Sequence, residues 1–278
     1  MAIISAFADE IDPSPNVQIK VLNQAGIDHV DLRGAWGVNV MKLSEDQRGR
    51  LKERFDDAGV KVACIGSPIG KIRLDDDLDQ HFEDFKHAVE LTDQFECHYI
   101  RIFSFYPPQG QDIIDHRQTV IDRLQQMCEY VKGSQITLVL ENESDIYGDK
   151  PEQCLELMRE LQAQSPHLVM AFDPANFVVA DALPVYETCW QPLRDYVGYF
   201  HIKDRQAGPT APCVPCGQGA GDVEKILADA AKMRQDWILT LEPHLKTAGQ
   251  FAGSTGADLF KVAARALIEV CDRVGMSH

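Results

Sequence analysis

Four apolar runs in this chain each end on a side chain that binds metals well. The runs LVL, VMAF, GYF and ILTL lead into Glu141, Asp173, His201 and Glu242. Each run is typical of a buried strand whose last residue is polar. A single acidic residue in such a place is more often a helix cap or a surface charge, but four at the same structural level indicate one site. Three carboxylates and one imidazole are ligands that suit a hard divalent cation.

Eight short β-rich runs alternate with amphipathic helical patterns along the chain. The predicted strands cover residues 3–7, 29–32, 61–65, 99–103, 136–141, 169–173, 198–201 and 238–242. The helical patterns carry end signals, such as a capping box of Ser44 with Gln47 and a stop at Gly59. The chain has no linker-like Pro/Gly/Ser tract. This alternation therefore predicts an α/β fold, a single (β/α)8 TIM barrel domain over residues 1–278.

An open, doubly wound sheet is the alternative arrangement of alternating strands and helices. Such a sheet needs a glycine-rich turn after its first strand to bind a nucleotide, but residues 8–13 read ADEIDP. In a barrel, the C-terminal ends of the strands converge on one mouth, where ligands bind. The four candidate ligands end strands five to eight, so we expect them to share one half of that mouth.

This ligand set predicts one divalent metal ion as the cofactor. Carboxylates and one histidine, with room left for substrate oxygens, suit Mn²⁺, Mg²⁺ or Co²⁺. Of these ions, we expect Mn²⁺ to be the one that the site binds. Zn²⁺ is an alternative, although it usually takes more histidine or cysteine ligands.

Composition and charge narrow the classes of partner and compartment. The 278 residues carry a formal charge of −16, which argues against a nucleic-acid partner because backbone binding needs basic surface. The sequence has no apolar run of about 18 residues, so we predict no membrane span. Residues 1–10 become acidic at once and read as a first strand, not a signal peptide. Eight scattered cysteines indicate reduced thiols and a cytoplasmic setting.

Several residues near the strand ends are candidates for substrate contact. Arg101 interrupts an apolar strand, and because burying a lone charge is costly it must bind substrate or pair with a ligand carboxylate. His244 follows Glu242 by two residues and is a candidate acid/base or a partner of the ligands. The remaining candidates are Lys71, Lys203, Arg205 and, as an apolar wall, Trp36. A solvated side chain is the alternative for Lys203 and Arg205, and packing under a loop is the alternative for Trp36.

Two motifs beside the predicted seventh strand have more than one interpretation. The loop 217–222, GQGAGD, could bind phosphate through its N–H groups, or could form a tight turn with Asp222 capping the next helix. Cys213 and Cys216 form a CxxC pair. The sequence holds no second pair, so a redox or zinc role has little support.

Five segments resemble those of the xylose-isomerase-like TIM barrel superfamily, which includes sugar phosphate isomerases and epimerases and AP endonuclease family 2. They are ENE at 141–143, FDPANF at 172–177, HIKD at 201–204, GQGAGD at 217–222 and LEP at 241–243. The resemblance covers essentially the whole chain. It implies a metal-dependent isomerase or epimerase of a small sugar, ketose or sugar phosphate, and a homodimer or homotetramer.

The resemblance also implies a mechanism. In the epimerase branch, two metal-bound glutamates flank the substrate carbon: one removes a proton to give a metal-stabilised cis-enediolate, and the other returns it from the opposite face. By position these are Glu141 and Glu242. A Lewis acid beside the carbonyl lets a carboxylate of ordinary basicity remove the proton.

The sequence departs from the ketose 3-epimerase pattern at three positions. Asn176 stands where that branch has histidine, and we place it in the substrate shell. Ala207 replaces an arginine, with Arg205 nearby, and Tyr147 replaces a glutamate. The resemblance therefore supports the metal site more than a free-ketose substrate shell.

Three other functions are alternatives to the isomerase or epimerase. A metal-dependent dehydratase of a cyclic polyol ketone such as an inosose, or of a dehydroshikimate-like acid, uses the same metal and is the main alternative. Phosphodiester hydrolysis as in the DNA-repair branch, which the resemblance also includes, uses a three-metal cluster with several additional histidines, whereas only His201 and His244 fall at strand ends here. A non-catalytic metal- or sugar-binding protein is disfavoured by the presence of both glutamates.

Overall fold

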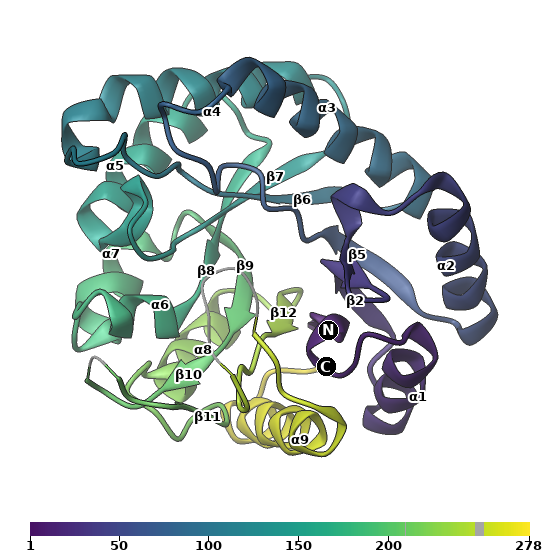
Figure 1. Cartoon of the computed structure of the whole chain (residues 1–278). Helices are drawn as coiled ribbons and strands as arrows, with labels where there is room; N and C mark the ends of the chain where they lie inside the picture. Colours follow the sequence, from purple (N-terminus) through teal and green to yellow (C-terminus); the bar gives the residue numbers. More distant parts are fainter. Residues whose placement is uncertain (209, 248–252) are drawn as a thin grey trace.

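In the computed structural model, residues 1–208, 210–247 and 253–278 are described, and they contain eight parallel strands that form a nearly closed barrel (Figure 1). The strands are β1 (Ile3–Ala6), β2 (His29–Leu32), β5 (Lys61–Ile65), β6 (Tyr99–Ile102), β7 (Thr137–Glu141), β8 (Leu168–Phe172), β9 (Val197–Ile202) and β12 (Ile238–Leu241). The predicted TIM barrel is confirmed. Each strand begins and ends within one residue of its predicted range.

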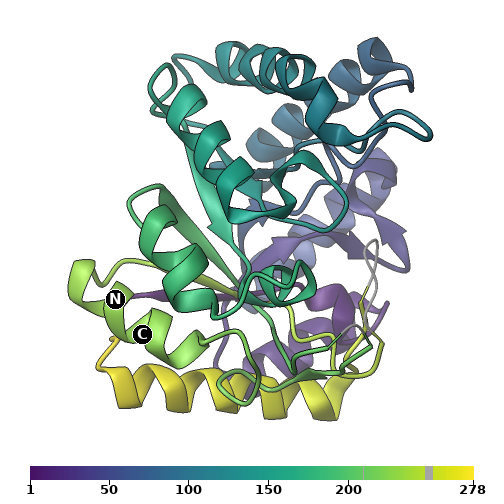
Figure 2. The ribbon, with the colours of Figure 1, turned by 90° about the vertical axis from the view of Figure 1, so that its left-hand side faces the viewer.

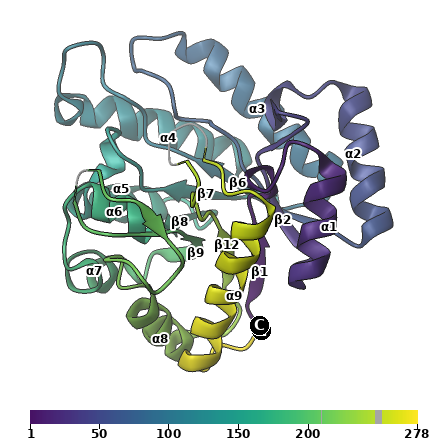
Figure 3. The ribbon, with the colours of Figure 1, turned by 60° about the horizontal axis from the view of Figure 1, so that its bottom comes forward.

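Helices surround the barrel on its outside, as Figures 1 and 3 show. They are α1 (Pro15–Ala25), α2 (Glu45–Ala58), α3 (Leu78–Phe95), α4 (Arg117–Val131), α5 (Pro151–Gln162), α6 (Pro174–Val179), α7 (Gln191–Leu193), α8 (Val223–Met233) and α9 (Ala257–Val274). Two short strand pairs are β3 (Gly34–Ala35) with β4 (Val38–Asn39), and β10 (Asp204–Arg205) with β11 (Cys213–Val214). Among the described helices, none has the length and apolarity needed to cross a membrane.

Sequence signals explain where the helices begin and end. The predicted capping box of α2 is present, because Ser44 and Gln47 bond each other's backbone N–H groups at 2.9 and 3.2 Å. Gly59 then ends the helix in the left-handed conformation. Asp222 stands at the predicted N-cap position of α8, but its side chain makes no capping hydrogen bond and accepts from the Tyr186 N–H at 3.1 Å instead.

The barrel closes through side chains at one seam. Backbone ladders join the strands in the order β1-β12-β9-β8-β7-β6-β5-β2, so β1 and β2 stand at the two ends of the ladder. These strands lie side by side, and Ser5 Oγ on β1 donates a hydrogen bond of 2.6 Å to Asp31 Oδ1 on β2. The chain termini lie at the start of β1 (Figure 2), where the Ala2 N–H donates to the Ser277 carbonyl at 2.6 Å.

Strand alternation sets which side chains enter the barrel. Residues two apart on a strand face the same side, so every inward residue at a strand end has another inward residue one layer below. This relation holds for His201 above Tyr199, Glu242 above Thr240, and Arg33 above Asp31. The lower part of the interior is packed by Cys64, Val139, Ala171, Tyr199 and Ile238. The polar residues at the strand ends therefore lie above a layer of packed side chains in the barrel interior.

Candidate metal and substrate site

Four strand-end side chains converge on one buried point. Glu141 ends β7, Asp173 and Glu242 directly follow β8 and β12, and His201 is the second-last residue of β9. One ligand atom from each lies within 4.8 Å of the others, and all four residues are buried. His201 Nδ1 lies 2.9 Å from Glu141 Oε1 and 3.7 Å from Glu242 Oε2. The structure therefore brings the complete predicted ligand set together.

Three buried cations face these carboxylates. The ion pairs are Arg101–Glu141 at 3.3 Å, Lys203–Asp173 at 2.8 Å and Arg33–Glu242 at 3.0 Å. Three further carboxylates join the same network, namely Asp9, Glu10 and Asp31. With all six carboxyls ionised and His201 and His244 neutral, the three Lys and Arg side chains leave a net charge of −3. All of these carboxyls except Asp9 are buried, and such an excess of carboxyl groups favours binding of a cation.

Neighbouring charges move the pKa values of the ligand carboxyls in different directions. Burial would raise the pKa of Glu141, but His201 and Arg101 outweigh burial and bring it down to about 2. Burial raises the pKa of Asp173 to about 6, although Lys203 acts in the opposite direction. Glu141 is therefore held as a carboxylate, whereas an added positive charge would favour ionisation of Asp173.

The orphaned polar atoms of the site fit a divalent cation. Within the described residues, neither ring nitrogen of His201 has a hydrogen-bond partner, and neither does Glu242 Oε2. Although His201 Nδ1 is close to Glu141, the contact lacks hydrogen-bond alignment. Buried polar atoms without partners are rare in folded proteins. Oxygen and imidazole donors that face one another in this way match the ligands that Mn²⁺ and Mg²⁺ take.

Two asparagines support Asp173 from behind. Asn142 exchanges hydrogen bonds with the backbone of Asp173 at 2.9 and 3.0 Å. Asn176 donates its side-chain amide to the Asn142 carbonyl at 2.8 Å, and its N–H donates to Asp173 Oδ1 at 3.0 Å. Asn176 is predicted to contact substrate, but its side-chain amide donates a hydrogen bond to the protein backbone. Its substrate contact stays a prediction.

His244 is held rigidly beside Glu242. Its backbone has a positive φ of 50°, and its N–H donates to Glu10 Oε2 at 3.0 Å. Its Nε2 lies 3.3 Å from Glu10 Oε1 and 3.4 Å from Glu242 Oε1. Glu10, Glu242 and His244 form a second group with metal-binding atoms, but Arg33 already lies 3.0 Å from Glu242 and 3.8 Å from Glu10. The guanidinium supplies the positive charge there.

Arg101 and Lys71 each pair with a carboxylate near the mouth of the barrel. Arg101 is buried and pairs with the ligand carboxylate of Glu141, as one of its two interpretations predicts. Lys71 Nζ lies 2.9 Å from Glu143 and 4.3 Å from the centre of the Phe103 ring. Both cations therefore stand at the mouth with protein partners.

Arg205 and Trp36 contact other parts of the protein and not the candidate ligands. The Arg205 guanidinium donates to the carbonyls of Gly208 and Ala211 at 3.1 and 3.0 Å, so it braces its own loop. The half-buried Trp36 ring lies 5.7 Å from the guanidinium carbon of Arg50 on α2. Their contact with substrate stays a prediction.

The glycine loop after β9 wraps a carboxylate. The N–H groups of Gly217, Gly219 and Gly221 donate to the two oxygens of Asp204 at 2.9, 2.9 and 3.0 Å. These donors are the ones that a phosphate would need. Because Asp204 occupies them, the loop is a turn around an internal carboxylate and not a phosphate cradle.

Replacing Gly219 by alanine tests this description of the loop. A Cβ at Gly219 would lie 2.2 Å from Asp204 Oδ1 and 2.4 Å from the Arg205 carbonyl oxygen. We expect Gly219→Ala to lower the free energy of unfolding by about 1–3 kcal/mol, measured by urea denaturation. Gly49→Ala on α2 is the control, since nothing lies within 4 Å of its Cβ and alanine favours a helix. Equal stability of the two variants would contradict the description.

Sequence reasoning missed several residues of the site, including Glu10, Arg33 and Asn142. Arg33 and Glu10 follow the first two strands as charged residues, and that signal was present in the sequence. Both are buried and pair inside the mouth. Asn142 follows Glu141 directly, but no sequence pattern shows that its amide turns towards Asp173.

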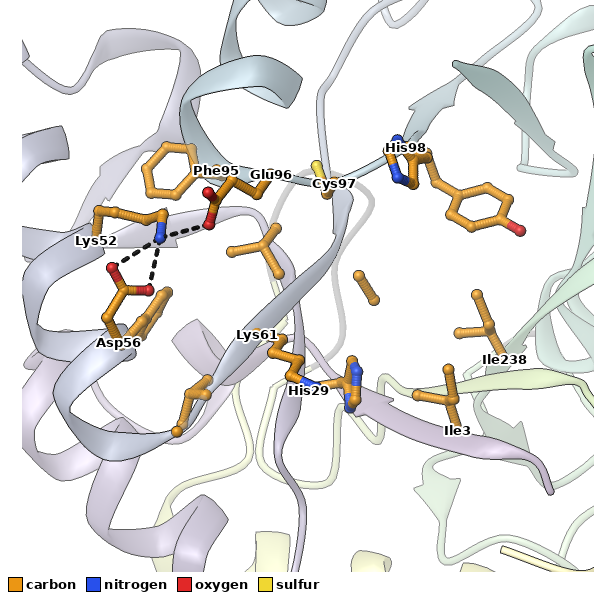
Figure 4. A pocket seen from close by; sticks show the side chains of 16 residues that line it. Ile3, His29, Lys52, Asp56, Lys61, Phe95, Glu96, Cys97, His98 and Ile238 are labelled. Atoms are coloured by element: carbon orange, nitrogen blue, oxygen red, sulfur yellow. Dashed lines mark hydrogen bonds and ion pairs between the residues drawn. The ribbon is translucent and has the colours of Figure 1, made fainter. Parts of the chain in front are cut away.

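A cavity of about 490 Å³ lies at the opposite end of the barrel (Figure 4). Its lining includes the first residues of five strands, Ile3, His29, Lys61, Tyr99 and Ile238. Its one charged cluster is internally paired among the labelled residues, since Lys52 bonds both Asp56 and Glu96 at 2.6 and 2.8 Å. The N-terminal face of such barrels serves stability, so the mouth is the candidate active site.

Comparisons with known proteins agree with this fold. A curated 3-dehydroshikimate dehydratase of Bacillus anthracis is 22% identical over 179 residues, which cover 64% of this chain and 62% of that protein. A xylose isomerase-like TIM barrel protein of Mycobacterium smegmatis, solved in complex with magnesium, has a TM-score of 0.75 at 16% identity and covers 98% of this chain and 97% of its own. D-allulose 3-epimerase from Methylomonas sp., solved with D-allulose, has a TM-score of 0.71 at 15% identity, with 98% and 97% covered.

The structural relatives show the shared fold, and the family model shows the membership. The model of the xylose isomerase-like TIM barrel family matches residues 19–269, which is most of the chain. The relatives named above include an epimerase and a dehydratase. This chain belongs to the xylose isomerase-like TIM barrel family.

Proposed function

We propose that this chain is a divalent-metal-dependent isomerase or epimerase of a small sugar, ketose or sugar phosphate, with Glu141 and Glu242 as the proton-transfer pair. One observation carries the proposal. Each glutamate places one oxygen on an arginine and turns the other towards His201 Nδ1, at 2.9 Å for Glu141 and 3.7 Å for Glu242. Two carboxylates that approach one point from different strands can serve opposite faces of one bound carbon.

The side chains around this pair have definable tasks. A divalent ion, held by Glu141, Asp173, His201 and Glu242, would supply Lewis-acid stabilisation of negative charge on the substrate oxygens. Arg101 and Arg33 each fix one oxygen of a glutamate, which orients the free oxygen for proton transfer. One glutamate takes the proton from the substrate carbon, and the other holds the proton that is returned.

A metal-dependent dehydratase of a cyclic polyol ketone or a dehydroshikimate-like acid is the second candidate. The curated relative named above favours it. The residues around the site also favour it, because the side chains near the positions that orient a ketose in the epimerase branch bond to other parts of the protein. Asn176 donates to the Asn142 carbonyl, Arg205 donates to carbonyls of its own loop, and the Tyr147 hydroxyl donates to Glu156 at 2.6 Å.

One experiment separates the two candidates. The protein is loaded with Mn²⁺ and incubated in D₂O with ketoses, ketose phosphates, inososes and dehydroshikimate, and the products are followed by NMR and ultraviolet absorbance. Deuterium uptake with an isomerised or epimerised product supports the proposal. Loss of water with a new conjugated carbonyl absorbance supports the dehydratase. No deuterium uptake at C1–C3 of any sugar would contradict the proposal.

Removal of the metal should affect both turnover and stability. We expect EDTA to abolish turnover and Mn²⁺ to restore it. Metal at about 100 times its dissociation constant should raise the free energy of unfolding by about 2.7 kcal/mol over the metal-free protein, because only the folded chain holds the four ligands together. Urea denaturation with and without Mn²⁺ measures the difference. Unchanged stability and turnover after dialysis against EDTA would contradict the metal site.

A further inference from the structure

Asp31 on β2 is a carboxylate in the core of the barrel, one layer below the ligands. It is 1% exposed. Ser5 Oγ donates to its Oδ1 at 2.6 Å, and the Tyr199 hydroxyl lies 2.8 and 2.9 Å from its two oxygens. Among the described residues, no lysine or arginine forms an ion pair with it. A buried carboxylate without a cationic partner is costly, so its presence needs an explanation.

The ring of His201 supplies that explanation. Its Nδ1 faces Glu141 and Glu242, whereas its Nε2 lies 3.9 Å from Asp31 Oδ2 and has no hydrogen-bond partner in the part of the chain that is described. A neutral imidazole that offers the Nδ1 lone pair must carry its proton on Nε2. The carboxylate that faces this nitrogen is Asp31, whose Oδ2 at 3.9 Å is close enough to attract the proton electrostatically.

We propose that Asp31 is a positioning residue for His201: its carboxylate, 3.9 Å from Nε2, favours the proton on that nitrogen and so favours the tautomer whose Nδ1 is free to bind a metal. The inference rests on the metal site proposed above. Histidine ligands commonly donate their second ring N–H to a carboxylate, and loss of that partner weakens metal binding. Tyr199 holds both oxygens of Asp31, and Thr240 Oγ1 extends the network by donating to the Tyr199 hydroxyl at 3.3 Å.

A purely structural role for Asp31 is the competing explanation. Its hydrogen bond with Ser5 joins β1 to β2 at the seam where the backbone ladder is interrupted. Ser5→Ala removes this contact but keeps the carboxylate beside His201. Asp31→Asn keeps the size of the side chain but leaves a single oxygen for the donors of Ser5, Tyr199 and His201. The two variants therefore separate closure of the barrel from orientation of the histidine.

Calorimetric titration of the metal-free proteins with Mn²⁺ provides the first test. We expect Asp31→Asn to weaken Mn²⁺ binding about 10- to 100-fold and Ser5→Ala to bind like the wild type. Wild-type affinity in Asp31→Asn, or equal losses in both variants, would overturn the inference. A wild type that binds no Mn²⁺ would instead overturn the metal site of the proposed function.

A spectroscopic measurement on the wild type keeps the test valid if Asp31→Asn fails to fold. The chain is labelled with ¹⁵N-histidine and loaded with diamagnetic Zn²⁺, and the ring nitrogens are observed by long-range ¹H–¹⁵N correlation. The spectrum of His201→Gln assigns the signal of His201. We expect the proton on Nε2 and the metal shift on Nδ1. A proton on Nδ1, or a metal shift on Nε2, would overturn the inference.

Discussion

Replacing either Glu141 or Glu242 by glutamine should lower kcat by a factor of about 10²–10⁴, because an amide cannot exchange the proton that the carboxylate transfers. Glutamine keeps the size of the side chain and an oxygen towards the metal. The loss should therefore appear in kcat while one equivalent of Mn²⁺ still binds. Steady-state kinetics and metal titration of the two variants, on the substrate found in the D₂O screen, measure both quantities.

The two glutamates should also differ in the face of the substrate that they serve. If the reaction is an epimerisation, Glu141→Gln and Glu242→Gln should each retain solvent deuterium exchange for one epimer only, and not for the same one. Glu129→Gln on the exposed side of α4 is the matched control, because its partner is the surface Lys132. Turnover of either site variant at the control's rate would contradict the assignment of the proton-transfer pair.

Replacing Arg33 by methionine should cause the largest loss of stability. Its side chain is 7% exposed and lies within 4 Å of three carboxylates, Asp9, Glu10 and Glu242. The variant removes the guanidinium from these carboxylates, and breaking a buried ion pair typically costs about 3–5 kcal/mol. Urea denaturation of the metal-free proteins measures the change, so that bound metal does not offset it.

A surface ion pair supplies the control for Arg33. Arg123 on α4 lies 3.7 Å from Asp79, whose side chain is 97% exposed. Arg123→Met should therefore change the free energy of unfolding by less than about 1 kcal/mol. A similarly small change for Arg33→Met would show that the buried network does not depend on this guanidinium.

The strands and their ends could be predicted because the barrel imposes a strong local pattern. Each strand is a short apolar run between helical segments, so the boundaries agree to within one residue. The seam between β1 and β2 could not be predicted in this way. It depends on the contact of Ser5 with Asp31, which are 26 residues apart and belong to no common pattern.

The convergence of the four candidate ligands could be predicted from the topology of the barrel, whereas the orientation of the residues around them could not. Parallel strands bring Glu141, Asp173, His201 and Glu242 to one mouth whatever their partners are. The orientation of long side chains depends on competition between partners. Arg205, for example, turns to the carbonyls of its own loop and not to the site. The segment 29–33 carried an available signal, since Asp31 and Arg33 are charged residues at an inward spacing of two within an apolar strand.

The anomalous scattering of a crystal soaked in Mn²⁺ tests the central claim most directly. The account predicts one strong anomalous peak at the mouth, within bonding distance of side-chain atoms of Glu141, Asp173, His201 and Glu242. A peak bound by other residues, or a fully exchanged crystal with no peak among these four side chains, would contradict it.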